Sequence, residues 1–159
     1  LSSKNLLRLL LLTNILVLIS VYYIEYVMNV YACILCKYQR IPYFIISLLL
    51  IYLITSKEVN IKIIYLIIFC LMINIGLSFY HIGIEQNIFS ETKACKATGS
   101  ILNQEDLLKQ FKTNKIAGCA NVNFTLLGMS LSSLNFIMNI VFLAIYAFII
   151  KNEKNFLYR

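Results

Sequence analysis

Four long apolar runs constrain the fold of this chain more than any other feature of its sequence. They cover residues 6–28, 41–55, 63–80 and 131–150. A helix needs about 20 apolar residues to cross a hydrocarbon core about 30 Å thick, and each run approaches or reaches that length. With 60% hydrophobic and 13% charged residues, the chain is more apolar than a soluble domain. The runs therefore predict an all-α membrane protein, a four-transmembrane-helix bundle forming a single domain over residues 1–159.

The second run is the shortest, and its length indicates where its helix begins. Its fifteen residues rise about 22 Å at about 1.5 Å each, which is less than the thickness of the hydrocarbon core. We therefore expect the helix to extend back through Arg40 and Lys37, which places both side chains near the membrane interface. The segment "SKEVNIK" at 56–62 is a tight polar connection, so the second and third spans form an antiparallel hairpin.

Four crossings divide the remaining segments between the two faces of the membrane. Residues 29–40 form a short external loop and residues 81–130 a long one, both on the same face. The termini and the tight polar connection lie on the other face. Within the long loop, "QEDLLKQF" carries Leu107, Leu108 and Phe111 with amphipathic spacing. This spacing predicts a short helix on the membrane surface.

The basic residues indicate an orientation in the membrane rather than a nucleic-acid partner. The net charge is +7, but Lys and Arg are scattered at the ends of the apolar runs, where such residues anchor helices at the headgroups. Each face carries seven of them, and five on the loop face lie in the long loop. Long loops translocate largely regardless of charge, so we expect cytoplasmic termini. The first run is too long for a signal-peptide core, so we expect a retained span.

Five cysteines are present, and the first close pair has three possible uses. Cys70 lies within the third run and is expected to be a small packing residue. Cys33 and Cys36 form a Cys-x-x-Cys, and a structural disulfide closing so short a loop gains little chain entropy. A zinc site needs four ligands, and no second Cys-x-x-Cys or paired histidine is present. Redox use is favoured, because this motif lowers the thiolate pKa and a cation such as Arg40 or Lys37 lowers it further.

The second pair, Cys95 and Cys119, lies in the long polar loop. One interpretation is a plain disulfide that closes the loop. The other is a labile disulfide, exposed in a mobile loop where the thiolate of another protein can attack it. The local sequence leaves both interpretations open.

Three segments resemble the DsbB family of thiol:quinone oxidoreductases, which includes the BdbC proteins. "CILCKYQR" at 33–40 is similar to the family signature Cys-x-Leu-Cys-x-x-Gln/Glu-Arg. "YHIGIEQNIF" at 80–89 resembles the Tyr-His-x-Gly-x-Glu stretch of many bacterial members. "CANVNFTLLGMSLSSLN" at 119–135 is similar to the segment that leads into their fourth span. The order of spans, external loops and cysteine pairs extends the resemblance over nearly the whole chain.

The resemblance implies an enzyme of disulfide bond formation, a folding aid in the bacterial inner membrane with its cysteine pairs in the periplasm. Its implied partner is a periplasmic thioredoxin-fold oxidase, DsbA-like, whose reduced dithiol attacks a Cys95–Cys119 disulfide and forms a mixed disulfide at Cys95. Electron transport then continues through Cys33 and Cys36 to a membrane quinone, either ubiquinone or menaquinone. These four cysteines are the expected catalytic residues.

The start of the second span offers a quinone site at the depth of the lipid headgroups. Arg40 follows Cys36 by four residues, so the two share one face of a helix. The guanidinium can stabilise a Cys36 thiolate and the negative charge that builds on a quinone oxygen, which is the arrangement the resemblance implies. Gln39 is a further candidate. His81, the only histidine, is expected to relay protons or to hydrogen-bond the quinone ring.

Polar residues in the apolar runs predict which helix faces point into the bundle. Four residues of the third run follow one helical stripe that should avoid lipid: Asn74, Ser78, His81 and Glu85. Glu25 lies near the end of the first span on the cysteine face, where Arg40 or Lys37 can pair with it. Asn135 and Asn139 in the fourth span are expected to hydrogen-bond between helices.

Two alternative functions use the same residues differently. A redox protein of the vitamin K epoxide reductase type shares the quinone and Cys-x-x-Cys chemistry, but its outer-loop pair comes first in the chain, whereas here the Cys-x-x-Cys does. A non-enzymatic membrane subunit with structural disulfides or zinc requires neither a quinone nor Arg40. The redox interpretation expects no resident metal. The sequence carries no signal for an oligomeric state.

Overall fold

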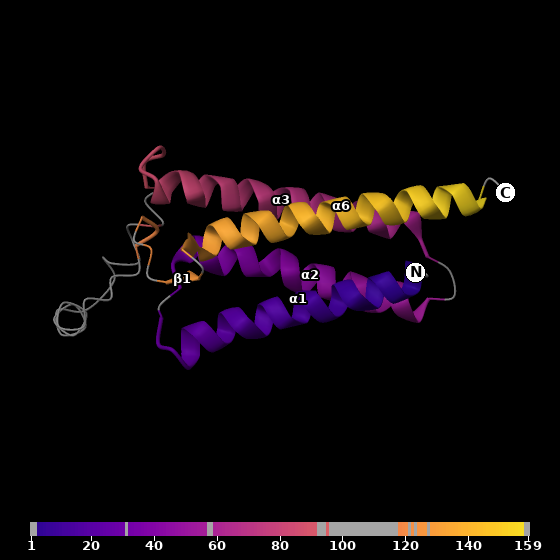
Figure 1. Ribbon diagram of the computed structural model, residues 1–159, viewed down its shortest axis with the longest axis horizontal. Coiled ribbons are helices and arrows are strands. Elements are labelled where there is room, and N and C mark those ends of the chain that lie inside the picture. The colour runs from indigo at the N-terminus through magenta and orange to yellow at the C-terminus, as the bar shows by residue number, and fades with distance from the viewer. Residues whose placement is uncertain are drawn as a thin grey trace.

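Four long helices form a bundle in the computed structural model (Figure 1), which describes residues 3–30, 32–56, 59–91, 95, 118–120, 122, 124–126 and 128–157. They are α1 (Ser3–Tyr26), α2 (Ile34–Thr55), α3 (Ile61–Glu85) and α6 (Leu131–Leu157). Each is long and apolar enough to cross a membrane. The predicted four-helix membrane bundle is confirmed, and the protein is a multi-pass membrane protein.

The helices alternate in direction along the chain (Figure 1). The start of α1 and the end of α6 lie at one end of the bundle, together with the connection between α2 and α3. The connection between α1 and α2 lies at the other end, with the end of α3 and the start of α6. The start of α2, with Cys33 and Cys36, therefore lies at the same end of the bundle as the end of α3 and the start of α6.

Helix α2 begins earlier than its apolar run, at Ile34, so its first two turns include Lys37 and Arg40. The shortness of the apolar run predicted that the helix extends back to include these two residues. Cys33 is the N-cap, and its sulfur accepts a hydrogen bond from the backbone N–H of Cys36 at 3.2 Å. The positive end of the helix dipole favours negative charge at this position, and therefore favours a thiolate.

Helix α3 runs to Glu85, past the end of the predicted span at residue 80, and its polar stripe points inward. Asn74, Ser78 and His81 are buried, and Glu85 is half-buried. This is the orientation that the helical spacing predicted. The extension past residue 80 places the last two members of the stripe, His81 and Glu85, at the end of the bundle where the cysteines lie.

Aliphatic side chains fill the centre of the bundle, where α3 packs against α2 and α6 and α1 packs against α2. Leu50, Ile67 and Leu71 are fully buried there, and Cys70 belongs to the same cluster, as expected for a packing residue. Large apolar side chains also point outward: Leu48 is 69% exposed and Phe69 is 61% exposed. Such an apolar outer surface suits lipid rather than water.

Hydrogen bonds between polar side chains join the helices inside this apolar bundle. Asn14 of α1 donates to the hydroxyl of Ser47 in α2 at 2.6 Å. Asn139 of α6 donates to the Tyr43 hydroxyl of α2 at 3.3 Å and accepts from Asn74 of α3 at 3.3 Å. The predicted interhelical role of Asn139 is confirmed. Polar groups in hydrocarbon are costly unless paired, so these contacts favour one packing arrangement of the helices.

A small antiparallel hairpin precedes α6 and was not predicted. Strand β1 (Thr125–Leu126) pairs with β2 (Met129–Ser130), and Gly128 takes a positive φ of 78° in the turn. Two-residue strands are too short to show a period of alternation in a sequence. The amphipathic helix predicted at residues 104–111 lies outside the described residues.

Candidate redox site

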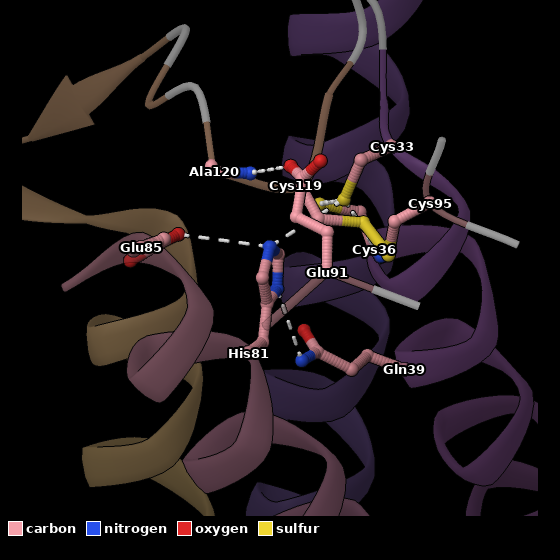
Figure 2. The surroundings of a disulfide bond; sticks show 9 residues. All are labelled: Cys33, Cys36, Gln39, His81, Glu85, Glu91, Cys95, Cys119 and Ala120. Carbon is pink, nitrogen blue, oxygen red and sulfur yellow. Dashed lines mark hydrogen bonds and ion pairs between the residues drawn. A yellow bond between two sulfur atoms is a disulfide. The ribbon is translucent and has the colours of Figure 1, made fainter. Parts of the chain in front are cut away.

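Both cysteine pairs lie together at one end of the bundle (Figure 2). Cys33, Cys95 and Cys119 form one buried cluster with Leu35 of α2 and Ile84 of α3. The exposed fractions of these cysteines are 4%, 2% and 1%. Counting membrane crossings predicted only a shared face, whereas the structure packs the two pairs against each other.

Cys95 and Cys119 form a disulfide, with their Cα atoms 5.6 Å apart. This is the pairing that the family resemblance implied. The segment after Cys119 is held by Glu91, whose carboxylate accepts a hydrogen bond from the backbone N–H of Ala120 at 2.9 Å. The disulfide is buried, which differs from the exposed bond that the labile interpretation expected. An attacking thiolate therefore reaches it only after the residues that cover it move.

Cys33 and Cys36 are free thiols at the start of α2. Their sulfur atoms lie 2.8 Å apart, beyond the roughly 2.05 Å of a disulfide bond. Cys33 is buried, and Cys36 is half-buried. The Cys95–Cys119 pair is thus bonded and the Cys33–Cys36 pair is not, and the two pairs pack together in one cluster.

His81 connects the end of α3 to the dithiol (Figure 2). Its Nε2 lies 3.5 Å from the sulfur of Cys33 and 3.7 Å from a carboxylate oxygen of Glu85. Its Nδ1 lies 3.4 Å from the side-chain nitrogen of Gln39. Gln39 in turn accepts a hydrogen bond from Asn135 at 3.2 Å, which confirms the interhelical role predicted for Asn135. The ring is 3% exposed, so the protein fixes its position.

The environment of Cys33 favours its thiolate. A hydrogen bond from Cys36 lowers the pKa of Cys33 most, the contact with His81 lowers it further, and burial opposes both. The result is a pKa of about 5, against an ordinary value of 9.0. A thiolate is the form that attacks disulfides and binds metals. These contacts therefore favour the thiolate form of Cys33.

Arg40 is held at the same end of the bundle by contacts with α1. Its guanidinium forms an ion pair with Glu25, and its Cζ lies 4.8 Å from the centre of the Tyr22 ring, within cation–π distance. Glu25 thus pairs with Arg40, one of the two partners considered for it, while Lys37 is exposed. The contact with the dithiol comes instead from His81, for which the sequence suggested a role toward the quinone.

A cavity of about 480 Å³ opens beside these groups, between α1, α2 and α6. Its polar wall includes the residues that the sequence proposed for quinone binding: Cys36, Gln39, Arg40 and His81. Apolar side chains of α1 and α6, such as Leu16, Val17 and Met138, form much of the rest. An apolar chamber with a cation and a few hydrogen-bonding groups on one wall fits a flat ring that carries carbonyl oxygens.

Three residues of the site were missed by sequence reasoning. Tyr22 precedes Glu25 by three positions and therefore shares its helical face, so a signal was present. Ser132 donates to the Glu85 carboxylate at 2.6 Å. Glu91 holds a backbone group 29 residues away. The last two contacts depend on how the elements pack, and no local pattern in the sequence marks them.

The chain is similar to known proteins over most of its length. Residues 3–149 match the family described as disulfide bond formation protein DsbB. The chain is also 27% identical over 147 residues to the uncharacterized protein RP370 of Rickettsia prowazekii (strain Madrid E). That alignment covers 89% of this chain and 86% of the relative. No solved structure matches the chain.

Proposed function

The chain belongs to the DsbB family of disulfide bond formation proteins, and from this premise we propose that it carries electrons from a DsbA-like thioredoxin-fold oxidase to a membrane quinone. The family consists of membrane oxidoreductases that form disulfide bonds. The observation that carries the proposal is the single buried cluster that holds a disulfide and a dithiol beside an apolar cavity. The Cys-x-x-Cys precedes the loop pair in this chain, which is the reverse of the order in the vitamin K epoxide reductase type, and a structural subunit has no need of a cavity beside the Cys-x-x-Cys.

The first step is thiol–disulfide exchange with the partner. A thiolate of the reduced oxidase attacks the Cys95–Cys119 disulfide, breaks its sulfur–sulfur bond and forms a mixed disulfide at Cys95, as in the family. The second thiolate of the oxidase then attacks this mixed disulfide. The oxidase leaves with its disulfide formed, and Cys95 and Cys119 remain as thiols. Two electrons have moved, one sulfur–sulfur bond replacing another.

The second step is exchange between the two pairs within the protein. The Cys95–Cys119 dithiol reduces a Cys33–Cys36 disulfide, so that the Cys95–Cys119 bond forms again and two thiols appear at the start of α2. The bonded Cys95–Cys119 pair beside the unbonded Cys33 and Cys36 is the arrangement that this product requires. The shared cluster supports the step, because exchange requires sulfur atoms that can meet.

In the third step the dithiol is oxidised again, and a bound quinone supplies the two-electron acceptor. The residues of this chain prepare that transfer. Cys33 carries the thiolate, and His81 holds a ring nitrogen 3.5 Å from it, where a proton can be kept or passed on. Gln39 fixes the His81 ring from the other side. Arg40 offers positive charge at the cavity wall for a carbonyl oxygen.

The location proposed for this reaction is the bacterial inner membrane, with the cysteine pairs in the periplasm and the termini in the cytoplasm. The positive-inside rule counts residues in short loops and near span ends. With the five in the long loop set aside, the terminal face carries seven Lys and Arg against two on the cysteine face, which supports this orientation. An oxidising compartment on the cysteine side is also what a persistent disulfide requires. The acceptor is ubiquinone or menaquinone, whose apolar tails keep them in the bilayer.

The test is turnover with purified protein. Reduced thioredoxin-fold oxidase is added with ubiquinone or menaquinone, quinone absorbance is followed, and the redox state of each cysteine is trapped with a thiol reagent. Replacing any one of the catalytic cysteines by alanine should abolish turnover, while Cys70→Ala should leave it unchanged. Full activity of Cys95→Ala and Cys119→Ala toward the oxidase would contradict the proposed order of transfer.

A further inference from the structure

Three potential metal ligands meet at the dithiol. The sulfur atoms of Cys33 and Cys36 and one ring nitrogen of His81 all lie within 4.8 Å of one another. They come from the start of α2 and the end of α3, and the bundle holds these two helices against each other. Two thiolates and an imidazole are the donor set that zinc and other soft or borderline cations prefer.

The distances between these atoms are close to those of a tetrahedral zinc site. Bonds of about 2.3 Å to sulfur and about 2.0 Å to nitrogen separate the two donor atoms by about 3.5 Å. The Cys33 sulfur and Nε2 of His81 are 3.5 Å apart. Two sulfur ligands of one zinc ion lie about 3.8 Å apart, so the pair has to open from its 2.8 Å separation. A change of side-chain torsion at the half-buried Cys36 achieves this without moving a helix.

The groups around His81 also suit a metal ligand. Histidine ligands usually hold a hydrogen-bond partner at the nitrogen that does not bind the metal, and Gln39 occupies that position. A metal at Nε2 requires the proton on Nδ1. The Gln39 side-chain oxygen accepts this proton only after the amide turns over, which breaks its present hydrogen bond from Asn135. A carboxylate oxygen of Glu85 lies 3.7 Å from Nε2, close enough to be drawn toward a cation.

We propose that the reduced Cys33–Cys36 pair binds Zn²⁺ together with His81, and that the bound ion blocks electron transfer. The inference uses the dithiol of the proposed function but concerns a different ligand. Binding forms two zinc–sulfur bonds and releases the remaining thiol protons, and no electrons move. A Cys33–Cys36 disulfide has no thiolate to offer, so the ion binds only the reduced state. Three protein ligands leave one position open, which suits an exchangeable inhibitor rather than a structural ion.

The test is a titration of the purified full-length protein with Zn²⁺ alone, against a coloured chelator. The Cys95→Ala/Cys119→Ala variant is used beside the unchanged protein, so that its reduced form presents only the dithiol at α2. We expect one ion per chain in both reduced proteins and none in the oxidised ones. His81→Ala should lower the affinity by about 100-fold or more, and Cys70→Ala should not change it.

Cadmium provides a spectroscopic check, because cadmium–thiolate bonds absorb in the ultraviolet. The band should appear in the reduced protein and be lost in Cys33→Ala and in Cys36→Ala. Gln39→Glu should tighten zinc binding, since a carboxylate accepts the Nδ1 proton better than an amide does. Equal binding to oxidised and reduced protein would overturn the proposal, as would an affinity that His81→Ala leaves unchanged.

Failure of this inference and failure of the proposed function give different results. Metal binding is measured without quinone or oxidase, so normal turnover together with no zinc binding refutes the metal site alone. Zinc binding to a protein that never reduces a quinone refutes the electron route alone. If both hold, added Zn²⁺ stops turnover at the reduced dithiol and a chelator restores it.

Discussion

The two cysteine pairs are built in different ways, although they share one cluster. The Cys33–Cys36 pair is fixed to a long helix: one sulfur caps α2, and a histidine of α3 contacts it. The Cys95–Cys119 pair lies outside the four spanning helices. It packs against Leu35 and Ile84, and Glu91 accepts a hydrogen bond from the neighbouring Ala120 N–H. The difference fits two tasks. The pair beside the cavity is positioned by helices, whereas the buried loop pair becomes accessible to another protein when the residues that cover it move.

Removing the Cys95–Cys119 pair should have the largest effect on electron transfer. In the Cys95→Ala/Cys119→Ala variant we expect no quinone reduction by a reduced thioredoxin-fold oxidase, because its entry disulfide is gone. A small dithiol such as dithiothreitol should still drive quinone reduction, because Cys33, Cys36 and the cavity are intact. Quinone absorbance measures both rates. Cys33→Ala is the matched control and should lose both reactions, and loss of both in the double variant would contradict separate tasks for the two pairs.

The thiol of Cys33 should lose its proton at a lower pH than an ordinary cysteine does. In the reduced protein its thiolate fraction is constant at neutral pH and falls as the pH drops through the pKa of about 5. Alkylation of Cys33, followed by mass spectrometry, should show that midpoint. His81→Ala removes a contact that lowers this pKa and should raise the midpoint by about 1 to 2 pH units. His81→Gln retains a hydrogen-bond donor and should shift it less, and an unchanged midpoint in both variants would exclude His81 from activating the thiolate.

Arg40 should affect the reaction with quinone and not the reaction with the oxidase. Arg40→Ala removes the positive charge from the cavity wall and should raise the apparent KM for quinone about tenfold, the effect of losing one charge-assisted hydrogen bond. The apparent KM for the thioredoxin-fold oxidase should stay the same. Steady-state kinetics with each substrate varied in turn measures both values. A change in the KM for the oxidase, with the KM for quinone unchanged, would contradict a role of Arg40 in quinone binding.

The smallest expected effect concerns the helices that support the first pair. Asn139→Ala removes hydrogen bonds to Tyr43 and Asn74 and should destabilise the bundle by about 1 kcal/mol. Unfolding in detergent measures this loss. Leu48→Ala, at a side chain that is 69% exposed, is the control and should have less effect. A larger loss in the control would mean that outward apolar contacts, rather than the polar network, hold the helices together.

Much of this architecture could be predicted because it depends on features local to one helix. Apolar length predicted the four spans, and the shortness of the second run predicted that α2 includes Arg40. The inward stripe of α3 followed from the spacing of Asn74, Ser78 and His81. Each of these inferences needs only the period of a helix and the cost of polar groups in lipid.

The contacts between elements could not be predicted in the same way. The approach of His81 to Cys33 depends on how α2 and α3 are packed, 48 residues apart in the chain. The sequence therefore offered Arg40, four residues after Cys36, as the group that stabilises a thiolate, and gave no sign that His81 contacts Cys33. The burial of the Cys95–Cys119 disulfide and the hairpin before α6 likewise arise from tertiary packing.

The N-cap of α2 links the stability of this helix to the redox state of the Cys33–Cys36 pair. The sulfur that accepts the Cys36 amide proton is the one that changes between thiolate and disulfide. An ionised sulfur accepts that proton more strongly than a bonded one. The first turn of α2 should consequently be more stable when Cys33 and Cys36 are reduced than when they form a disulfide. Exchange of the Cys36 backbone hydrogen with heavy water should therefore be slower in the reduced protein.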